Sequence, residues 1–228
     1  VDLLAPSRLE ARIADIDVRT ASRIEPPHGA GGTIHLCAID GDGLAVSLTQ
    51  SNCAGFGAHI VVPLVKVFLN NRGSGFSLTR GHAAEYGPGR RPPHTLCPTV
   101  VTTPDGRARY ALGTMGADSQ PMILLQLLAR LLVSGEDPAE AVAAARWVLA
   151  APSGETFAVW HEPERLRVRI EEHAPASWVD GLRARGHAVE VIEPFAYVAG
   201  HAQVVAVEAG MLAGAADPRA LTGAAFGY

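Results

Sequence analysis

A threonine at the start of a predicted strand is the residue of this chain best suited to covalent chemistry. Thr33 directly follows Gly31-Gly32 and opens the alternating stretch TIHLCAID. If the chain is cut before Thr33, one residue supplies a hydroxyl that attacks and an α-amine that takes its proton. An α-amine with a pKa of ~7.7–8.0 suits that transfer near neutral pH. From the local sequence alone, an ordinary first residue of a strand is the alternative interpretation.

The cysteines and histidines give weaker signals. Cys37, Cys53 and Cys97 are an odd number at wide spacing, which fits neither a disulfide framework nor a CxxC metal site. We expect reduced thiols, with Cys53 left open as a residue that lines a pocket. The histidines show no HxH or HExxH spacing, so we expect no metal, and nothing in the sequence calls for another cofactor.

Composition excludes several classes of protein. The 228 residues can bury a sizeable core, and 48% hydrophobic with 18% charged residues excludes general disorder. A net charge of −4 argues against nucleic-acid binding, and no stretch approaches the ~20 apolar residues of a membrane span. We therefore expect no nucleic acid, no membrane and a cytoplasmic location. The chain lacks an initiator Met and a signal-peptide pattern, which suggests a processed product or a fragment.

The elements around Thr33 begin with a hairpin. TIHLCAID and LAVSLTQS alternate on either side of Asp40-Gly41-Asp42-Gly43, which predicts two strands and a turn. The segment 72–94 is rich in Gly, Pro and Arg, and a loop this long is usually functional. Together these segments predict a strand that presents Thr33 beside a functional loop.

The second half predicts helices and further strands. MILLQLLARLLVSG reads as a helix capped by Asp118 or Ser119 and ended by Gly135, and a second helix is predicted over 138–150. The apolar stretch 157–161 is among the strands predicted after them. This order predicts a layered α/β protein with a mainly antiparallel sheet.

Ten motifs in register across residues 33–228 resemble one family. The first is T-x-H-x-x-x-x-D-x-x-G-x-A-V-S, from Thr33 to Ser47. Together they resemble the small subunit of gamma-glutamyltransferases, N-terminal-nucleophile hydrolases that cut themselves before this Thr. The other nine are GFG at 55–57, LNNRGSGFSL at 69–78, PGRRPPHTLCPT at 88–99, LGTMGADSQP at 112–121, DPAEAVAAARW at 137–147, LRARGH at 182–187, GHAQ at 200–203, GAADPR at 214–219 and GAAFGY at 223–228.

The resemblance implies a fold and a partner. It implies a four-layer αββα sandwich, in which two mainly antiparallel sheets stack between helices. Residues 1–32 then resemble the tail of the large subunit, and 33–228 the catalytic small subunit. The rest of the large subunit, from the same precursor, is the implied partner, and the resemblance leaves room for a dimer of heterodimers.

The same resemblance assigns catalytic roles. Gly32-Thr33 matches the self-cleavage site and Thr33 the nucleophile. Ser51 matches a hydroxyl residue that orients the nucleophile. Gly116 and Ala117 match paired glycines whose N–H groups hold the oxyanion, at ~3–4 kcal/mol per donor. Ala117 keeps its N–H, and we expect a negative φ there.

Other residues match the substrate pocket. His94 and Thr95 occupy the position of two serines that hold a substrate carboxylate. Asn52 is a further pocket candidate. Asp118 either caps the following helix only or also orients the oxyanion turn.

Three departures change the expected substrate. Glutamyltransferases hold the α-amine of glutamate with acceptor side chains, and the matching residues here are Cys53, Arg72 and Gly75. Arg72 would repel an ammonium group and suits a carboxylate instead. The pattern resembles the acylase-like branch, so we expect an acidic acyl group and negligible γ-glutamyl activity.

Several alternatives remain open at this point. The chain could be a self-processing Thr amidohydrolase or acyltransferase, with water or an amine as acceptor. It could be a hydrolase of C–C bonds in an antibiotic pathway of the alkylproline type. It could also be a non-catalytic relic that keeps the fold. An uncut Gly32-Thr33 bond in purified protein would favour the relic.

Overall fold

The computed structural model describes residues 6–7, 10, 32–152 and 157–227. The chain divides into two units, Val1–Ala30 and Gly31–Tyr228. In the first unit only residues 6, 7 and 10 are described, and they are helical. Of the predicted division into 1–32 and 33–228, the first part lies mostly outside the described residues, so the division stays a prediction.

A four-stranded antiparallel sheet forms the centre of the second unit. Its strand order is β11-β10-β6-β5, and every neighbouring pair is antiparallel. Alternation along β6 sends Tyr110 and Leu112 to one face and Ala111 and Gly113 to the other. The strands are β5 (Thr99–Thr102), β6 (Ala108–Met115), β10 (His201–Glu208) and β11 (Met211–Ala216).

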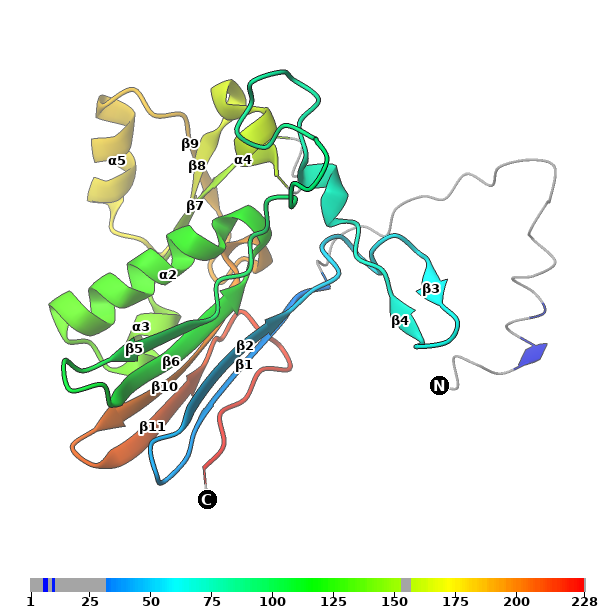
Figure 1. Cartoon of the computed structure of the whole chain (residues 1–228). Helices are drawn as coiled ribbons and strands as arrows, with labels where there is room; N and C mark the ends of the chain where they lie inside the picture. Colours follow the sequence, from blue (N-terminus) through cyan, green and yellow to red (C-terminus); the bar gives the residue numbers. More distant parts are fainter. Residues whose placement is uncertain (1–5, 8–9, 11–31, 153–156, 228) are drawn as a thin grey trace, which may run out of the picture. The chain divides into compact units, whose positions relative to one another are not determined.

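Helices cover one face of this sheet (Figure 1). Helix α2 (Gln120–Ala129) has Pro121 in its first turn, continues as a wider turn over Arg130–Ser134 and ends at Gly135, as predicted. Gly135 has φ 67°, a conformation that glycine adopts readily. Helix α3 (Pro138–Ala143) packs beside α2. The core between helices and sheet comprises Tyr110, Leu112, Ile123, Leu124, Leu127, Leu131, Ala141, Val142, Val148, Ala202, Val204, Ala206 and Ala215.

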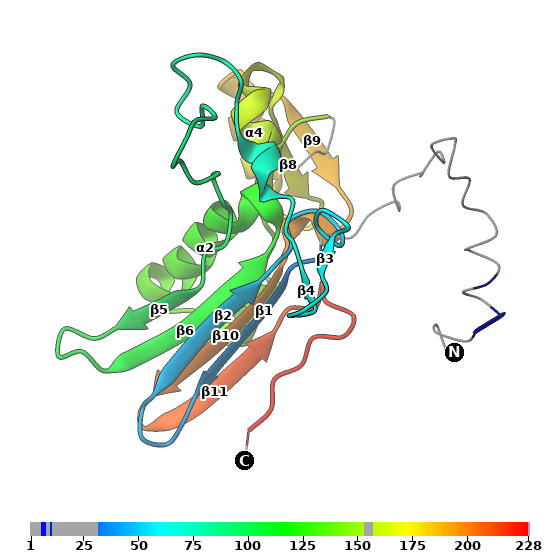
Figure 2. The ribbon, with the colours of Figure 1, turned by 45° about the vertical axis from the view of Figure 1, so that its right-hand side comes forward.

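The predicted hairpin covers the other face (Figure 2). Strands β1 (Ile34–Ile39) and β2 (Ala45–Gln50) are antiparallel, and the Ser47 hydroxyl donates to the Leu112 carbonyl oxygen of β6 at 2.9 Å. This gives a helix layer and two stacked sheets, so the predicted α/β fold with mainly antiparallel sheets is confirmed. The outward face of the hairpin is apolar and exposed, through Ile34, Leu36, Leu44, Val46 and Leu48.

A third sheet and several short elements complete the unit. Strand β7 pairs with β8 antiparallel, and β8 pairs with β9 in parallel through the connecting helix α5. The bounds are β7 Trp147–Ala150, β8 Arg167–Glu171, α5 Ala176–Ala184 and β9 Val189–Ile192. The short elements are β3 Val61–Val62, β4 Val67–Phe68, η1 Arg72–Gly75, η2 Ala117–Ser119, α4 Ala158–His161, η4 Pro163–Arg165 and η5 Tyr197–Ala199.

The helix predicted over 138–150 is wrong in its second half, which forms β7. Two buried arginines explain where the helix ends. Arg146 and Arg219 both donate to the Val142 carbonyl oxygen, and Arg219 also donates to that of Ala144 at 2.9 Å. The last carbonyl groups of a helix have no N–H partner within the helix, and here the two arginines bind them.

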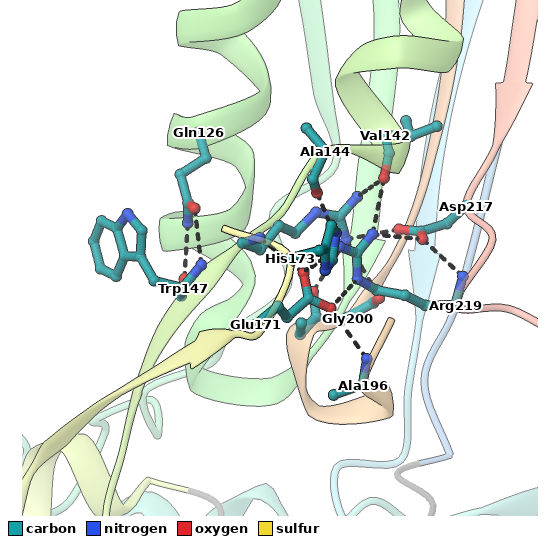
Figure 3. Close-up of polar contacts among 12 residues, drawn as sticks. Gln126, Val142, Ala144, Trp147, Glu171, His173, Ala196, Gly200, Asp217 and Arg219 are labelled. Atoms are coloured by element: carbon teal, nitrogen blue, oxygen red, sulfur yellow. Dashed lines mark hydrogen bonds and ion pairs between the residues drawn. The ribbon is translucent and has the colours of Figure 1, made fainter. Parts of the chain in front are cut away.

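The same arginines belong to a buried ion-pair network (Figure 3). Arg219 binds the carboxylates of Glu171 and Asp217, and Arg146 pairs with Asp217 at 2.6 Å. Burial lowers the pKa of Arg146 to about 10, against the favourable effect of Asp217. Glu171 also accepts a hydrogen bond from the Ala196 N–H at 3.0 Å. The network therefore holds the turn that leads into β10.

The strand predicted over 157–161 is also wrong, because this segment forms the short helix α4. Its first turn is held by a distant side chain rather than by a sheet. The Val159 N–H donates to the Asp118 carboxylate at 3.3 Å, across 41 residues of sequence. No local pattern in the sequence reports that contact.

Candidate active site

Thr33 and Ser51 face each other one step beyond the ladder of β1 and β2. Ile34 pairs with Gln50, so the two hydroxyl residues are the next cross-strand neighbours. The Thr33 hydroxyl donates to Ser51 Oγ at 2.8 Å, and the Cys53 N–H donates to the same oxygen at 2.9 Å. Ser51 is therefore fixed by the backbone and in turn orients the Thr33 hydroxyl.

Gly32 lies where only a glycine fits. A Cβ at this position would lie 2.7 Å from the Gly55 carbonyl oxygen, which is closer than real Cβ contacts. Glycine has no Cβ, so it allows this close approach of two backbone segments. The residue before Thr33 is thus held against the GFG segment at 55–57.

His35 lies on the same face of the hairpin as Thr33, the face that packs on the four-stranded sheet. Its Nδ1 lies 2.9 Å from the Thr49 hydroxyl, and its Nε2 is buried without a hydrogen-bond partner among the described residues. A Cβ on Gly113 would lie 2.2 Å from the ring, so β6 approaches the hairpin closely here. Burial lowers the pKa of His35 to about 4, which keeps the ring neutral.

The packing of the hairpin on the sheet places Thr33 beside the candidate oxyanion turn. His35 faces Gly113, while Cys37 lies near Val205, whose partner in β6 is Ala111. Strands β1 and β6 therefore run in opposite directions, and two residues forward along β1 correspond to two residues back along β6. Thr33 lies two residues before His35, so it is level with Met115 at the end of β6, and Gly116 follows directly.

The turn after β6 has an unusual backbone. Gly116 has φ 146° and Ala117 has φ 46°. The expectation of a negative φ at Ala117 is therefore wrong. A non-glycine residue in the left-handed region costs ~1–2 kcal/mol, and the surrounding turn must hold it there. Ala117 still carries a backbone N–H, so the pair keeps two candidate oxyanion donors.

The predicted pocket residues Cys53 and Arg72 lie close together. Arg72 is 8% exposed, and both its terminal guanidinium nitrogens are buried without a hydrogen-bond partner in the described part of the chain. Burial raises the pKa of the Cys53 thiol, while the charge of Arg72 lowers it and that of Asp118 raises it. The thiol is therefore neutral, which argues against Cys53 as a nucleophile. Arg72 and Asp118 both lie close enough to act on this one thiol.

Asp118 does not cap helix α2, contrary to one predicted role. Helix α2 starts without any side-chain capping bond. The Asp118 carboxylate instead accepts the N–H of Val159 through Oδ2, and Oδ1 is buried without a partner among the described residues. Burial raises the pKa of Asp118, against the opposing effects of the Phe157 and Val159 N–H groups and of His161.

The end of the long loop is tied to the start of helix α2. The Cys97 N–H donates to the buried Gln120 Oε1 at 3.2 Å, which brings the segment after Thr95 to the oxyanion turn. His94 is exposed, and its Nδ1 accepts the Leu96 N–H at 3.3 Å. No hydrogen bond among the described residues joins His94 or Thr95 to Thr33. Asn52 is half-buried, and its carbonyl oxygen accepts the N–H of Asn71.

The described part of the chain holds no group of three or more His, Cys, Asp or Glu side chains that could bind a metal ion. Its three cysteines are free thiols. Among the same residues there is no helix with the length and apolar character needed to cross a membrane.

The helix layer and the two stacked, mainly antiparallel sheets have the fold of an N-terminal-nucleophile hydrolase, and Thr33 directly precedes the first strand. Residues 1–227 match the family described as Gamma-glutamyltranspeptidase, and the chain belongs to that family. The resemblance inferred from the sequence motifs is thereby confirmed.

The relatives include hydrolases and acylases. The chain is 37% identical over 227 residues to the oxamate amidohydrolase proenzyme of Klebsiella pneumoniae, covering 99% of this chain and 41% of that protein. Gamma-glutamyltranspeptidase from Pseudomonas nitroreducens complexed with L-DON superposes with a TM-score of 0.65 and 26% identity, over 85% of this chain and 97% of that one. For cephalosporin acylase from Bacillus halodurans the TM-score is 0.68 at 31% identity, over 81% and 32% of the two chains. The chain thus spans less than half the length of its proenzyme relative.

Sequence reasoning missed His35, Phe157 and the buried ion-pair network. His35 had a usable signal, because the second residue after Thr33 in a strand points to the same face. Phe157 had none. Its ring lies 2.9 Å from the position of a Cβ on Gly75, and these residues are 82 apart in sequence.

Proposed function

We propose that the protein containing this chain hydrolyses small amides whose acyl group carries a carboxylate, with Thr33 as the nucleophile. The buried guanidinium of Arg72 supports this assignment most directly. A buried charge without a partner is costly, and a carboxylate would satisfy both of its terminal nitrogens in a bidentate pair. The similarity to an oxamate amidohydrolase agrees, because oxamate is an amide that bears a carboxylate.

Cleavage of the Gly32–Thr33 bond would free the α-amine of Thr33, which acts as the base. The Thr33 hydroxyl attacks the amide carbon, its proton passes to the freed α-amine, and the N–H groups of Gly116 and Ala117 hold the resulting oxyanion. Collapse of this intermediate breaks the C–N bond, and the amine leaves with the proton from the α-amine. Water then hydrolyses the Thr ester by the same route and restores Thr33. Ser51 keeps the hydroxyl oriented throughout.

The same pocket disfavours γ-glutamyl substrates. The α-ammonium group of glutamate would lie near the positive charge of Arg72 and the uncharged Cys53 thiol. Like charges at partly buried distances repel by several kcal/mol. We therefore assign the chain to the acylase-like branch of the family rather than to its glutamyltransferases.

The remainder of the precursor is the proposed partner. The proenzyme relative is more than twice the length of this chain, and the outer face of the β1–β2 hairpin is apolar and exposed. A large subunit that covers this face would supply the fourth layer of the sandwich.

The test uses the full-length protein. Intact mass and N-terminal sequencing should show a chain that begins at Thr33, and ammonia should be released from oxamate and from glutaramate. Glutamine is the matched comparison, because it differs from glutaramate only by the α-ammonium group. Thr33→Ala should abolish cleavage and turnover while Thr33→Ser still processes. An intact Gly32–Thr33 bond with no turnover of any of these amides would identify the non-catalytic alternative.

A further inference from the structure

Two side chains of opposite charge, Arg72 and Asp118, lie near the Cys53 thiol and do not pair with each other. Arg72 and Asp118 both act on this thiol electrostatically, yet no ion pair joins them in the described part of the chain. The terminal nitrogens of Arg72 and Oδ1 of Asp118 are buried and lack hydrogen-bond partners there. Buried polar atoms are normally satisfied, so such a donor and acceptor beside one site indicate a ligand with both kinds of group.

Arg72 and Asp118 are each held by a different contact near Phe157. The turn that carries Arg72 ends at Gly75, where the Phe157 ring leaves no room for a Cβ. Asp118 is anchored two residues beyond Phe157 in the chain, through the Val159 N–H at 3.3 Å. This bond occupies Oδ2 and leaves Oδ1 as the available acceptor. Neither side chain is thus positioned by the other.

We propose that Asp118 makes the site selective for amides that keep an N–H, because its Oδ1 accepts a hydrogen bond from the scissile amide nitrogen while Arg72 holds the carboxylate. This inference rests on the proposed function. A carboxylate oxygen accepts hydrogen bonds and cannot replace a missing N–H, so a fully substituted amide leaves Oδ1 buried and unpaired.

The position of Asp118 in the chain supports this assignment. It directly follows Ala117, whose N–H would hold the carbonyl oxygen of the same amide. In oxamate the carboxylate and the amide are on adjacent carbons, so the groups that bind them must also be neighbours. Contacts around Phe157 bring the two segments together, since its ring lies against Gly75 at the end of the Arg72 turn and the Val159 N–H, two residues on, binds Asp118.

Three substrates with the same acyl group test the proposal in the full-length protein. Oxamate has two amide N–H groups, N-methyloxamate keeps one, and N,N-dimethyloxamate has none. The wild type should lose roughly 100-fold or more in kcat/KM only when the last N–H is removed, since sites built to bind such a group reject analogues that lack it. If kcat/KM falls as much from oxamate to N-methyloxamate as from N-methyloxamate to N,N-dimethyloxamate, the proposal is overturned. This series needs no variant.

Asp118→Asn separates hydrogen bonding from size. The amide oxygen of the new side chain can still accept the Val159 N–H, while its NH2 replaces the free acceptor by a donor. In this variant kcat/KM for oxamate should fall ~10- to 100-fold, while kcat/KM for N,N-dimethyloxamate should not change. The ratio of the two values should therefore fall by the same factor. If the site excludes the dimethyl compound by size alone, the variant keeps the full discrimination, and the proposal fails. Asp105→Asn, the same change in an exposed turn, is the control.

A lack of any activity and a lack of N–H selectivity have different consequences. If the wild type releases no amine from any of the three compounds, the proposed function itself fails. If oxamate is hydrolysed but removal of the last N–H has no larger effect than the first, the function stands and the role of Asp118 is refuted.

Discussion

Replacing Arg72 by Gln tests the pocket through its single most unusual side chain. The substitution removes the charge and the bidentate donor geometry at a position that is 8% exposed. Loss of a charged contact at this depth should cost ~2–4 kcal/mol of transition-state stabilisation, or roughly 30- to 1000-fold in kcat/KM for glutaramate. The loss arises only with substrate bound, because the terminal guanidinium nitrogens have no hydrogen-bond partner among the described residues.

The assay is ammonia release from glutaramate and glutamine by the processed full-length protein. Glutamine should be the poorer substrate for the wild type, and the gap should narrow in Arg72→Gln because repulsion of the α-ammonium group disappears. Arg91→Gln, an exposed arginine of the same loop, is the matched control and should change neither rate.

Stability measurements distinguish the pocket from a structural role. Arg72→Gln removes a buried charge whose terminal nitrogens have no hydrogen-bond partner in the described part of the chain, so the free energy of unfolding should stay the same or rise. An unchanged glutaramate rate together with lower stability would show that Arg72 is a loop contact. Wild-type preference for glutamine would refute the reasoning about substrate charge.

Three substitutions probe the scaffold of the site, each in the full-length protein. Ala117→Gly should relieve the cost of φ 46° and raise the free energy of unfolding by up to ~1 kcal/mol, after the greater chain entropy of Gly is allowed for. An unchanged value would mean that the turn is unstrained. Gly113→Ala should destabilise by ~1–3 kcal/mol, because its Cβ would lie 2.2 Å from the His35 ring. Urea unfolding measures both. Arg219→Met should cost ~3–5 kcal/mol by leaving two buried carboxylates without this cation, whereas Arg107→Met, from an exposed pair, should cost less than ~1 kcal/mol. Equal effects of the two arginines would contradict the importance of burial.

The sequence by itself determined the elements whose signals are local. The hairpin that carries Thr33 follows from strict alternation around Asp40–Gly43, and helix α2 follows from Pro121 and Gly135 at its ends. The family and its fold could also be predicted, because the motifs occur in order along most of the chain. The pairing of Thr33 with Ser51 was predicted from the same resemblance, and the hairpin register brings the two hydroxyls together.

Tertiary structure alone decided the points where distant side chains act on the backbone. Arg219 helps to end helix α3 from 75 residues away, so that Trp147–Ala150 becomes a strand despite its helical pattern. The Asp118 carboxylate holds the start of α4 in the same way. The left-handed φ of Ala117, and the approach of Arg72 and Asp118 to one thiol, likewise depend on packing between segments far apart in sequence. Periodicity and capping rules describe interactions within a few residues, so they carry no information about such contacts.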